Sequence, residues 1–331
     1  MSNETHHYGF RILGDCRSER RLVDWPAAFS AYCQCDARAE VGREAYLSAF
    51  TFGEAFREHL TTTGTTKGYS GPCWTPWLWF DIDAADDLEH AHKAAKSLCA
   101  VLIERYRLDD DALLIFFSGS KGFHVGLPTA LFTPDGSALF HRIARQFAEH
   151  VATLAGIEID SGVYDCVRAF RAPNSRHPKT GLHKRRFQFE ELLHLATGRI
   201  AQYAETPEPF ELPTNLVAKN QTAMSDWQQA AHQVANEREA MRQRQQALAS
   251  GASDATLNRA TLEFLRNGAT VGDRHRLLFS AAANLAEFRC PGALAHALLT
   301  ESALDSGLSP SEVRRQIDCG LNRVIVEGGT P

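Results

Sequence analysis

The pattern of apolar and polar residues predicts strands and helices in the first part of the chain and helices alone in the last part. Short apolar runs over residues 77–83 and 113–117 are typical of buried strands. Apolar residues recur at helical spacing over 86–106 and 137–155, and again throughout 255–325. The sequence therefore predicts an α+β domain followed by an all-α domain.

A change in composition predicts where the two domains meet. Prolines gather at positions 207, 209 and 213, and residues 224–250 are rich in Gln, Ala and Arg with few large apolar side chains. Such a segment suits a solvated connecting helix better than a core element. We therefore expect an α+β domain over 1–212, a helical linker over 213–252 and a helical domain over 253–331.

Length and composition narrow the class of protein. The 331 residues, 44% of them hydrophobic, suffice for one large domain or two ordinary ones. The chain has no long apolar run and no signal-peptide pattern at its start, so we expect a cytoplasmic protein without membrane contact. The eight cysteines are scattered, and Cys33 and Cys35 have the wrong spacing for a zinc knuckle, which favours reduced thiols over a metal site.

The first candidate chemistry lies at the end of the apolar run over 77–83. Asp81 and Asp83 are separated by Ile82, so on a strand both carboxylates point to the same face. Neighbouring carboxylates repel each other, and Mg²⁺ or Mn²⁺ relieves that repulsion because these ions take oxygen ligands. Taken alone, such a pair is more often a strand that runs into a polar loop, so a metal site needs support from other residues.

A glycine-rich loop follows the second apolar run. Residues 118–124 read Ser-Gly-Ser-Lys-Gly-Phe-His, and the glycines let backbone amides approach an anion closely. Lys121 and His124 add cationic or hydrogen-bonding side chains that suit a triphosphate. A glycine-rich turn with a core histidine is the alternative, and the spacing of a Walker A loop is absent.

A third acid and a basic segment follow the helix predicted over 137–155. Asp160 can complete a three-carboxylate site with the two earlier aspartates, the arrangement that holds two metals for in-line nucleotidyl transfer. Asp165, inside a loop, is the second choice. Residues 168–186 contain seven Lys or Arg, two His and no acid, in a chain of net charge −5. This local positive patch suits phosphate binding, with a solvated basic loop as the alternative.

In this order the motifs resemble the three signature motifs of the archaeo-eukaryotic primase superfamily. They read Phe-Asp-Ile-Asp at 80–83, Ser-Gly-Ser-Lys-Gly-Phe-His at 118–124, and Ile-Asp at 159–160 followed by Arg-Ala-Pro-Asn-Ser-Arg-His-Pro-Lys-Thr-Gly at 171–181. The resemblance covers about residues 60–200. The members that the chain most resembles are primase-polymerases of plasmids, phages and mobile elements.

The resemblance implies a fold and a set of residue roles. The catalytic core would have two α/β parts, one related to the RNA-recognition fold, with the site between them. Two Mg²⁺ or Mn²⁺ ions would be bound by Asp81, Asp83 and Asp160. The triphosphate of the incoming NTP or dNTP would be held by Ser118, Ser120, Lys121, Gly122 and His124, with further phosphate contacts from Arg171, His177 and Lys179.

The remaining basic residues are candidates for contact with a single-stranded DNA template. They are Arg176, Lys184, Arg185 and Arg186, together with Arg274 in a C-terminal segment that looks like the small helical domain that often follows such cores. The zinc module of cellular primase small subunits has no counterpart in the sequence, so we expect no structural zinc.

The resemblance implies a DNA-templated primase that makes and extends primers during replication of a plasmid, phage or mobile element, with a replicative helicase as a candidate partner. Three alternatives stay open from the sequence. They are a repair or end-joining polymerase that only extends, a non-catalytic replication initiator that binds nucleic acid, and a metal-dependent nuclease that uses the same carboxylates.

Overall fold

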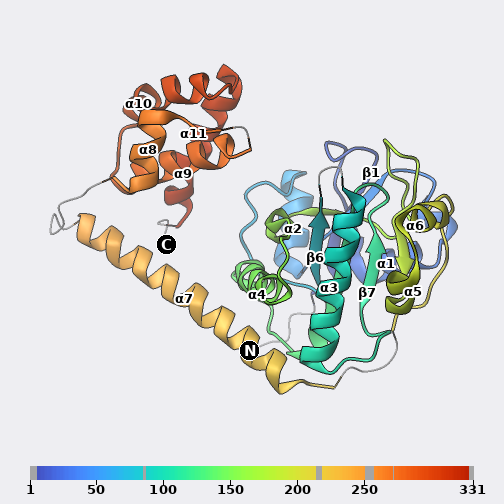
Figure 1. Ribbon diagram of the computed structural model, residues 1–331. Coiled ribbons are helices and arrows are strands. Elements are labelled where there is room, and N and C mark those ends of the chain that lie inside the picture. Colours follow the sequence, from blue (N-terminus) through green and yellow to red (C-terminus); the bar gives the residue numbers. More distant parts are fainter. Residues whose placement is uncertain (1–5, 85–86, 214–217, 250–256, 271, 328–331) are drawn as a thin grey trace. The chain divides into compact units, whose positions relative to one another are not determined.

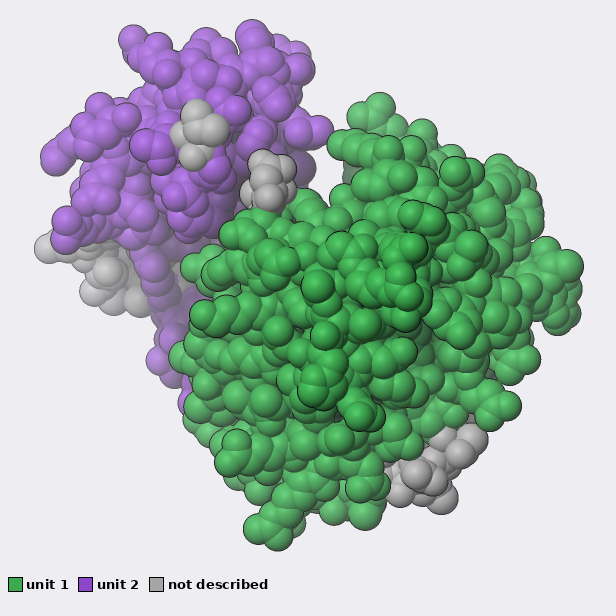
Figure 2. Space-filling model, turned by 45° about the vertical axis from the view of Figure 1, so that its right-hand side comes forward, with its two compact units in different colours: residues 1–235 green, residues 236–331 purple. Residues whose placement is uncertain are grey.

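The computed structural model describes residues 6–327 except 85–86, 214–217, 250–256 and 271. By its contacts the chain forms two compact units, residues 1–235 and 236–331, which Figure 2 shows in green and purple. Unit 1 therefore extends past residue 212, the end predicted for the α+β domain. Each unit is described by itself.

A six-stranded sheet opens unit 1. Its strands follow the order β5-β4-β1-β3-β9, with β2 paired to β1, and every pairing is antiparallel. The strands are β1 (Tyr8–Leu13), β2 (Arg21–Asp24), β3 (Ala45–Ser48), β4 (Thr51–Phe52), β5 (Cys73–Trp74) and β9 (Ala169–Arg171). The helices α1 (Trp25–Cys33) and α2 (Glu54–Thr63) and the short turn η1 (Ala37–Ala39) connect the early strands. The edge strand β9 comes from far along the chain and places Arg171 opposite Tyr46 of β3.

A four-stranded antiparallel sheet completes the unit, in the order β10-β7-β8-β6. Its strands are β6 (Trp77–Asp83), β7 (Leu114–Phe117), β8 (Gly122–Pro128) and β10 (Arg185–Phe187), and the helices α3 (Leu88–Tyr106) and α4 (Phe140–Ala155) lie between them in the sequence. Figure 1 shows α3 lying along this sheet.

The succession β-α-β-β-α-β in this second sheet is that of a split βαβ fold. The strand order places β6 at an edge of the sheet, whereas the RNA-recognition fold has the corresponding first strand in its interior. The edge position matters for the site, because the outer side of β6 keeps backbone groups that no sheet partner occupies.

The two sheets share one hydrophobic core. Trp79 of β6 joins them, since its ring lies 6.1 Å from Phe116 of β7 and 5.4 Å from Phe170 of β9. Gly126 of β8 faces the Trp79 ring, and a Cβ atom at that position would come within 2.7 Å of it. The aromatic residues of the predicted strand thus anchor the two aspartates that follow them.

The rest of unit 1 consists of short turns and helices. They are η2 (Thr129–Leu131), η3 (Ser161–Tyr164), α5 (Phe189–His194), α6 (Thr197–Tyr203) and the first half of α7 (Gln221–Ala249). The prediction of a solvated connector over 224–250 is wrong for this first half of α7. Ala223, Trp227, Ala230 and Val234 are buried at helical spacing on one face, so two alanines, a valine and a single tryptophan form that face without a high apolar content.

Unit 2 is entirely helical within its described residues, as predicted. After the second half of α7 it contains α8 (Arg259–Asn267), α9 (Arg274–Glu287), α10 (Gly292–Asp305) and α11 (Pro310–Glu327) around a small core that includes Phe264, Leu278 and Leu299. Ser309 caps α11, because its hydroxyl oxygen accepts from the amide of Glu312 while the Glu312 carboxylate accepts from the amide of Ser309. Within the described residues, no helix has the length and apolarity that a membrane span requires.

Candidate active site

The ladder between β6 and β8 brings the acidic pair and the glycine-rich loop together. Asp81 lies opposite His124, and Asp83 lies opposite Gly122. The Nε2 atom of His124 is 3.4 Å from Oδ1 of Asp81, and Nζ of Lys121 is 3.3 Å from Oδ2 of Asp83. Two motifs that are far apart in the sequence therefore form one site.

The predicted alternation at the end of β6 is present. Ile82 is fully buried, the Asp81 side chain is only 13% exposed, and Asp83 is exposed. Ile82 shares one face of the strand with Phe80, and both carboxylates lie on the other face with Trp79, as the period of a strand requires.

Asp160 reaches the site through its backbone. Its amide donates to the carbonyl oxygen of Asp81 at 2.8 Å, a bond that the edge position of β6 makes available. The Asp160 side chain is exposed, and its Oδ1 accepts from the amide of Gly162 at the start of η3. Asp165, the second choice, lies at the other end of η3, where its carboxylate accepts from the amide of Val167.

Asp81 is the electrostatic centre of the site. Burial, followed by the charges of Asp83 and Asp160, raises its pKa to about 7, while Lys184 and Arg168 act in the opposite direction. Its Oδ1 atom is buried without a hydrogen-bond partner. The carboxylate is thus held where an anion is poorly solvated and repelled by two others.

His124 is neutral in this setting. Burial first, and then the positive charges of Lys184 and Arg171, hold its pKa well below the ordinary value. The 3.4 Å approach between His124 and Asp81 is therefore a contact between a neutral ring and a carboxylate and not an ion pair.

The donor set fits a hard divalent cation. Among the described residues, the three carboxylates do not have oxygens that all lie within 4.8 Å of one another, and closing the set requires the side chains of Asp83 and Asp160 to turn toward Asp81. Both of these side chains are solvent-exposed. A buried, unpartnered carboxylate oxygen with two acids beside it matches the ligand preference of Mg²⁺ or Mn²⁺.

The loop between β7 and β8 is closed by its own residues. The amide of Ser118 donates to the carbonyl of Gly122 at 2.9 Å, and the amide of Gly122 donates to the Ser118 hydroxyl at 3.2 Å. Ser120 and Lys121 form the more exposed tip of the loop. Gly119 has φ +85°, a backbone conformation that favours glycine.

Glycine at position 122 is required by close packing. A Cβ atom there would lie 2.2 Å from the carbonyl oxygen of Ile82 and 2.3 Å from Oδ1 of Asp83. The absence of a side chain is what lets the loop approach the second aspartate.

The basic segment meets this loop from the other side. The Thr180 hydroxyl donates to the carbonyl of Gly119, and the Cβ of His177 lies near the position that a Gly119 Cβ would take. The His177 ring accepts at Nδ1 from the amides of Lys179 and Thr180. Burial, with the charge of Arg171 next, lowers the pKa of His177.

Arg171 carries an unused donor into the same region. Its Nη2 donates to the Tyr46 hydroxyl at 3.2 Å and its guanidinium lies 5.0 Å from the Tyr46 ring centre, while its Nη1 is buried without a hydrogen-bond partner. Its charge acts on both His124 and His177. The structure thus brings together the three acids, Lys121, His124, Arg171 and His177.

Lys184 is not available to a template, which corrects the sequence prediction. Its side chain is 1% exposed, and its Nζ lies 4.3–5.2 Å from the ring centres of Trp79, Phe116 and Phe170 and donates to the carbonyl of Arg171 at 2.8 Å. Burial lowers the pKa of this ammonium well below its ordinary value, and the charge of Asp81 opposes that shift. Sequence reasoning missed this role because the three rings come from β6, β7 and β9.

Three further template candidates are engaged within the protein. Arg185 forms an ion pair with Glu208, and Arg186 donates to the carbonyl of Glu211 while lying 5.1 Å from the Phe210 ring centre. The acid-free basic segment is therefore partly neutralised by a later segment of the chain. Arg274, in unit 2, donates to the carbonyls of Ser306 and Gly307 at the end of α10.

Two exposed basic side chains remain near the site. Arg176 donates to the carbonyl of Gly181 but stays exposed, and Lys179 is exposed beside His177. Arg168, which was not a predicted template contact, is exposed as well. These three are the basic side chains of residues 168–186 that solvent, and hence a nucleic-acid backbone, can reach.

Comparison with known proteins gives little beyond this geometry. No protein-family model matches the chain, and no curated protein matches it. The solved structure of the primase RepB′ is similar at 12% sequence identity and a TM-score of 0.38, over 98% of this chain and 93% of that one. A likeness at this level carries no argument about function, which therefore rests on the residues of the site.

Proposed function

We propose that the protein is a DNA-templated nucleotidyltransferase that makes and extends primers. The observation that carries this proposal is the position of Asp81. Its buried, unpartnered carboxylate lies opposite the neutral His124 and beside the backbone of Asp160, within the electrostatic reach of two further acids. The resemblance of the three motifs to those of the archaeo-eukaryotic primase superfamily supports the same function.

The protein's own residues supply a surface for a triphosphate next to the acids. His124 can donate a hydrogen bond to a phosphate oxygen without adding charge, because its ring is neutral. The unpartnered Nη1 of Arg171 and the ammonium of Lys121 can supply positive charge to the same phosphates. Orientation and charge stabilisation are the main contributions that enzymes make to phosphoryl and nucleotidyl transfer.

Asp81, Asp83 and Asp160 would hold the divalent ions, which when bound lower the pKa of an attacking hydroxyl and neutralise a leaving pyrophosphate. The template would lie over Arg176 and Lys179, through contacts to its phosphates.

The test is nucleotide incorporation on unprimed single-stranded DNA, with Mg²⁺ or Mn²⁺ and with labelled NTPs or dNTPs. We expect short labelled products from the wild-type protein and none from Asp81→Asn. Asp165→Asn is the matched control, because it removes an acid at the other end of η3, and it should keep wild-type activity.

A second template that carries a primer separates two activities. If the protein extends the primer but makes no products on the unprimed DNA, the activity is primer extension alone and not primer synthesis. Shortening of the labelled DNA would point to a nuclease. If no metal-dependent incorporation occurs on either template, the proposal is wrong.

A further inference from the structure

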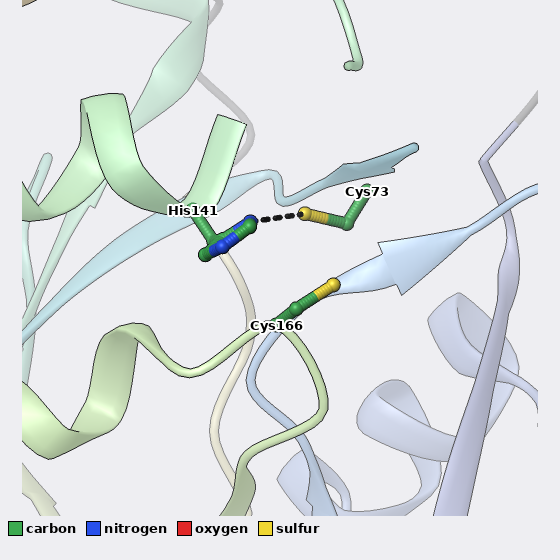
Figure 3. Close-up of side chains that lie close together, drawn as sticks. All are labelled: Cys73, His141 and Cys166. Carbon is green, nitrogen blue, oxygen red and sulfur yellow. Dashed lines mark hydrogen bonds between the residues drawn. The ribbon is translucent and has the colours of Figure 1, made fainter. Parts of the chain in front are cut away.

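Two cysteines and a histidine meet away from the acidic site. Cys73 lies on β5, His141 in the first turn of α4, and Cys166 between η3 and β9. Figure 3 shows their side chains directed toward one another. Sγ of Cys73 is 4.0 Å from Nδ1 of His141, and the three donor atoms all lie within 4.8 Å of one another.

The fold fixes each of these residues in place. Cys73 and Ser137 exchange two backbone hydrogen bonds of 3.1 Å, which hold the start of α4 beside β5. The amide of Arg168 donates to the carbonyl of Asp165 and closes a turn around Cys166. Both cysteines are buried and His141 is half-buried, so the three donors share a largely enclosed position.

The spacing of the donors is close to that of a tetrahedral zinc site. Bonds of about 2.3 Å to sulfur and about 2.0–2.1 Å to nitrogen place two sulfurs ~3.8 Å apart, and a sulfur and a nitrogen ~3.6 Å apart. The separation of 4.0 Å between Cys73 and His141 exceeds the sulfur–nitrogen value by about 0.4 Å, and the upper bound of 4.8 Å for the whole group exceeds the zinc values by about 1.2 Å at most. Small side-chain rotations would therefore close the set.

We propose that Cys73, His141 and Cys166 bind a zinc ion, with a water molecule in the fourth position. Two thiolates and an imidazole are the ligands that favour Zn²⁺ over the oxygen-seeking Mg²⁺ and Mn²⁺. The sequence predicts no such site, because the ligands lie in three separate parts of the chain and none belongs to a Cys-x-x-Cys pair.

The position of Cys166 makes the ion a cross-link between three parts of the fold. This cysteine lies on the segment between Asp160 and Arg171, while the other two ligands belong to β5 and α4. A bound zinc ion would tie that segment to the body of unit 1. The site does not depend on the proposed function, because metal binding here involves no nucleotide and no template.

The test measures metal in the full-length protein, expressed with added zinc and purified under reducing conditions without chelators. Elemental analysis should find one zinc ion per chain, and replacement by Co²⁺ should give the thiolate-to-metal charge-transfer absorption in the near ultraviolet. Cys73→Ser and Cys166→Ser should lose both signals. Cys33→Ser, which removes a buried thiol outside the cluster, and Cys16→Ser, which removes an exposed one, should keep both.

Loss of zinc in the serine variants could also result from misfolding, and a variant that should gain signal separates the two causes. His141→Cys offers a third thiolate, so it should retain zinc and show stronger charge-transfer absorption with Co²⁺ than the wild type. Three results would each overturn the proposal. The first is zinc that persists in Cys166→Ser, and the second is a wild-type protein that has neither zinc nor a cobalt–thiolate band. The third is a Cys73–Cys166 disulfide found by mass spectrometry under these reducing conditions.

Discussion

The backbone amide of Asp160 donates to the carbonyl oxygen of Asp81 at 2.8 Å. This bond forms on the open side of β6, which is one of the two edge strands of its sheet. It places a third acid beside two that the strand already presents, and the charges of Asp83 and Asp160 both raise the pKa of Asp81. The acids are assembled by the fold at an electrostatic cost to the protein.

That cost predicts that Asp81→Asn makes the protein more stable. The folded-state pKa of Asp81 is about 7, above an unfolded value of about 3.9. The folded protein therefore holds the proton to higher pH than the unfolded chain, and stability falls as pH rises from about 4 to about 7. Above pH 7, without divalent cations, the variant should be more stable by on the order of a few kcal/mol.

Urea unfolding of both proteins at pH 4.5 and pH 8, in the presence of EDTA, measures this difference. The gain should be present at pH 8 and mostly absent at pH 4.5. A variant that is less stable than the wild type at pH 8 would contradict the electrostatic account of Asp81.

The close approach of Gly122 to β6 predicts a second effect. Gly122→Ala adds a Cβ atom 2.2 Å from the carbonyl of Ile82, and the strands must separate to admit it. We expect a loss of ~1–3 kcal/mol of unfolding free energy, as for other overpacked positions. Chemical denaturation gives the value through the shift in midpoint.

Gly198→Ala is the matched control for this substitution. Gly198 lies in α6, and a Cβ there meets nothing within 4 Å. Since alanine favours a helix more than glycine does, this variant should be as stable as the wild type or slightly more stable. Equal losses at both positions would show that crowding at β6 is not the cause.

The helices and the acidic strand are the parts of the fold that the sequence predicts well. The helix predicted over 86–106 is α3 at Leu88–Tyr106, and the helix predicted over 137–155 is α4 at Phe140–Ala155. Their apolar positions repeat with a regular period, and that period depends only on neighbours along the chain. The alternation of Asp81, Ile82 and Asp83 can be predicted from the sequence for the same reason.

The environment of Lys184 was beyond sequence reasoning, because it depends on which strands meet. Its aromatic cage takes one ring from each of β6, β7 and β9, and the last of these strands belongs to the other sheet. The pairing of Arg185 with Glu208 depends likewise on the return of a later segment. The sequence shows that this segment is positively charged, but contacts between residues distant in sequence decide which of its side chains are buried.

The contrast between Lys179 and Lys184 predicts different responses of DNA binding to salt. Lys179 is exposed beside His177, whereas Lys184 is enclosed. Each phosphate contact on single-stranded DNA contributes about −0.7 to the slope of log affinity against log salt concentration. Lys179→Ala should therefore make the slope less negative by about 0.7, and Lys184→Met should leave it unchanged.

Fluorescence anisotropy with labelled single-stranded DNA, over a series of NaCl concentrations, gives both slopes. Arg176→Ala should behave like Lys179→Ala, because Arg176 is also exposed. If the slope becomes less negative in Lys184→Met and is unchanged in Lys179→Ala, then Lys184 and not Lys179 contacts the DNA phosphates.

The attachment of α7 to unit 1 predicts a pH-dependent contribution to stability. Asp226 is buried, and its carboxylate accepts from Nε and Nη2 of Arg105 at 2.7 and 2.8 Å and from the Tyr106 hydroxyl at 2.9 Å. Burial alone would raise the pKa of Asp226, but the hydrogen bonds from Arg105 and Tyr106 outweigh it and lower the pKa. Because the folded-state pKa lies below the unfolded value, this stability is present above about pH 4 and is lost as pH falls through the folded-state pKa.

Asp226→Asn should cost ~3 kcal/mol at pH 7, since it leaves Arg105 without its charged partner, and the difference from the wild type should shrink below pH 4. Thermal and urea unfolding across this pH range measure it, with Glu205→Gln, which alters an exposed acid, as the control. A difference that stays constant down to pH 3 would show that lost packing, and not the ion pair, is the cause.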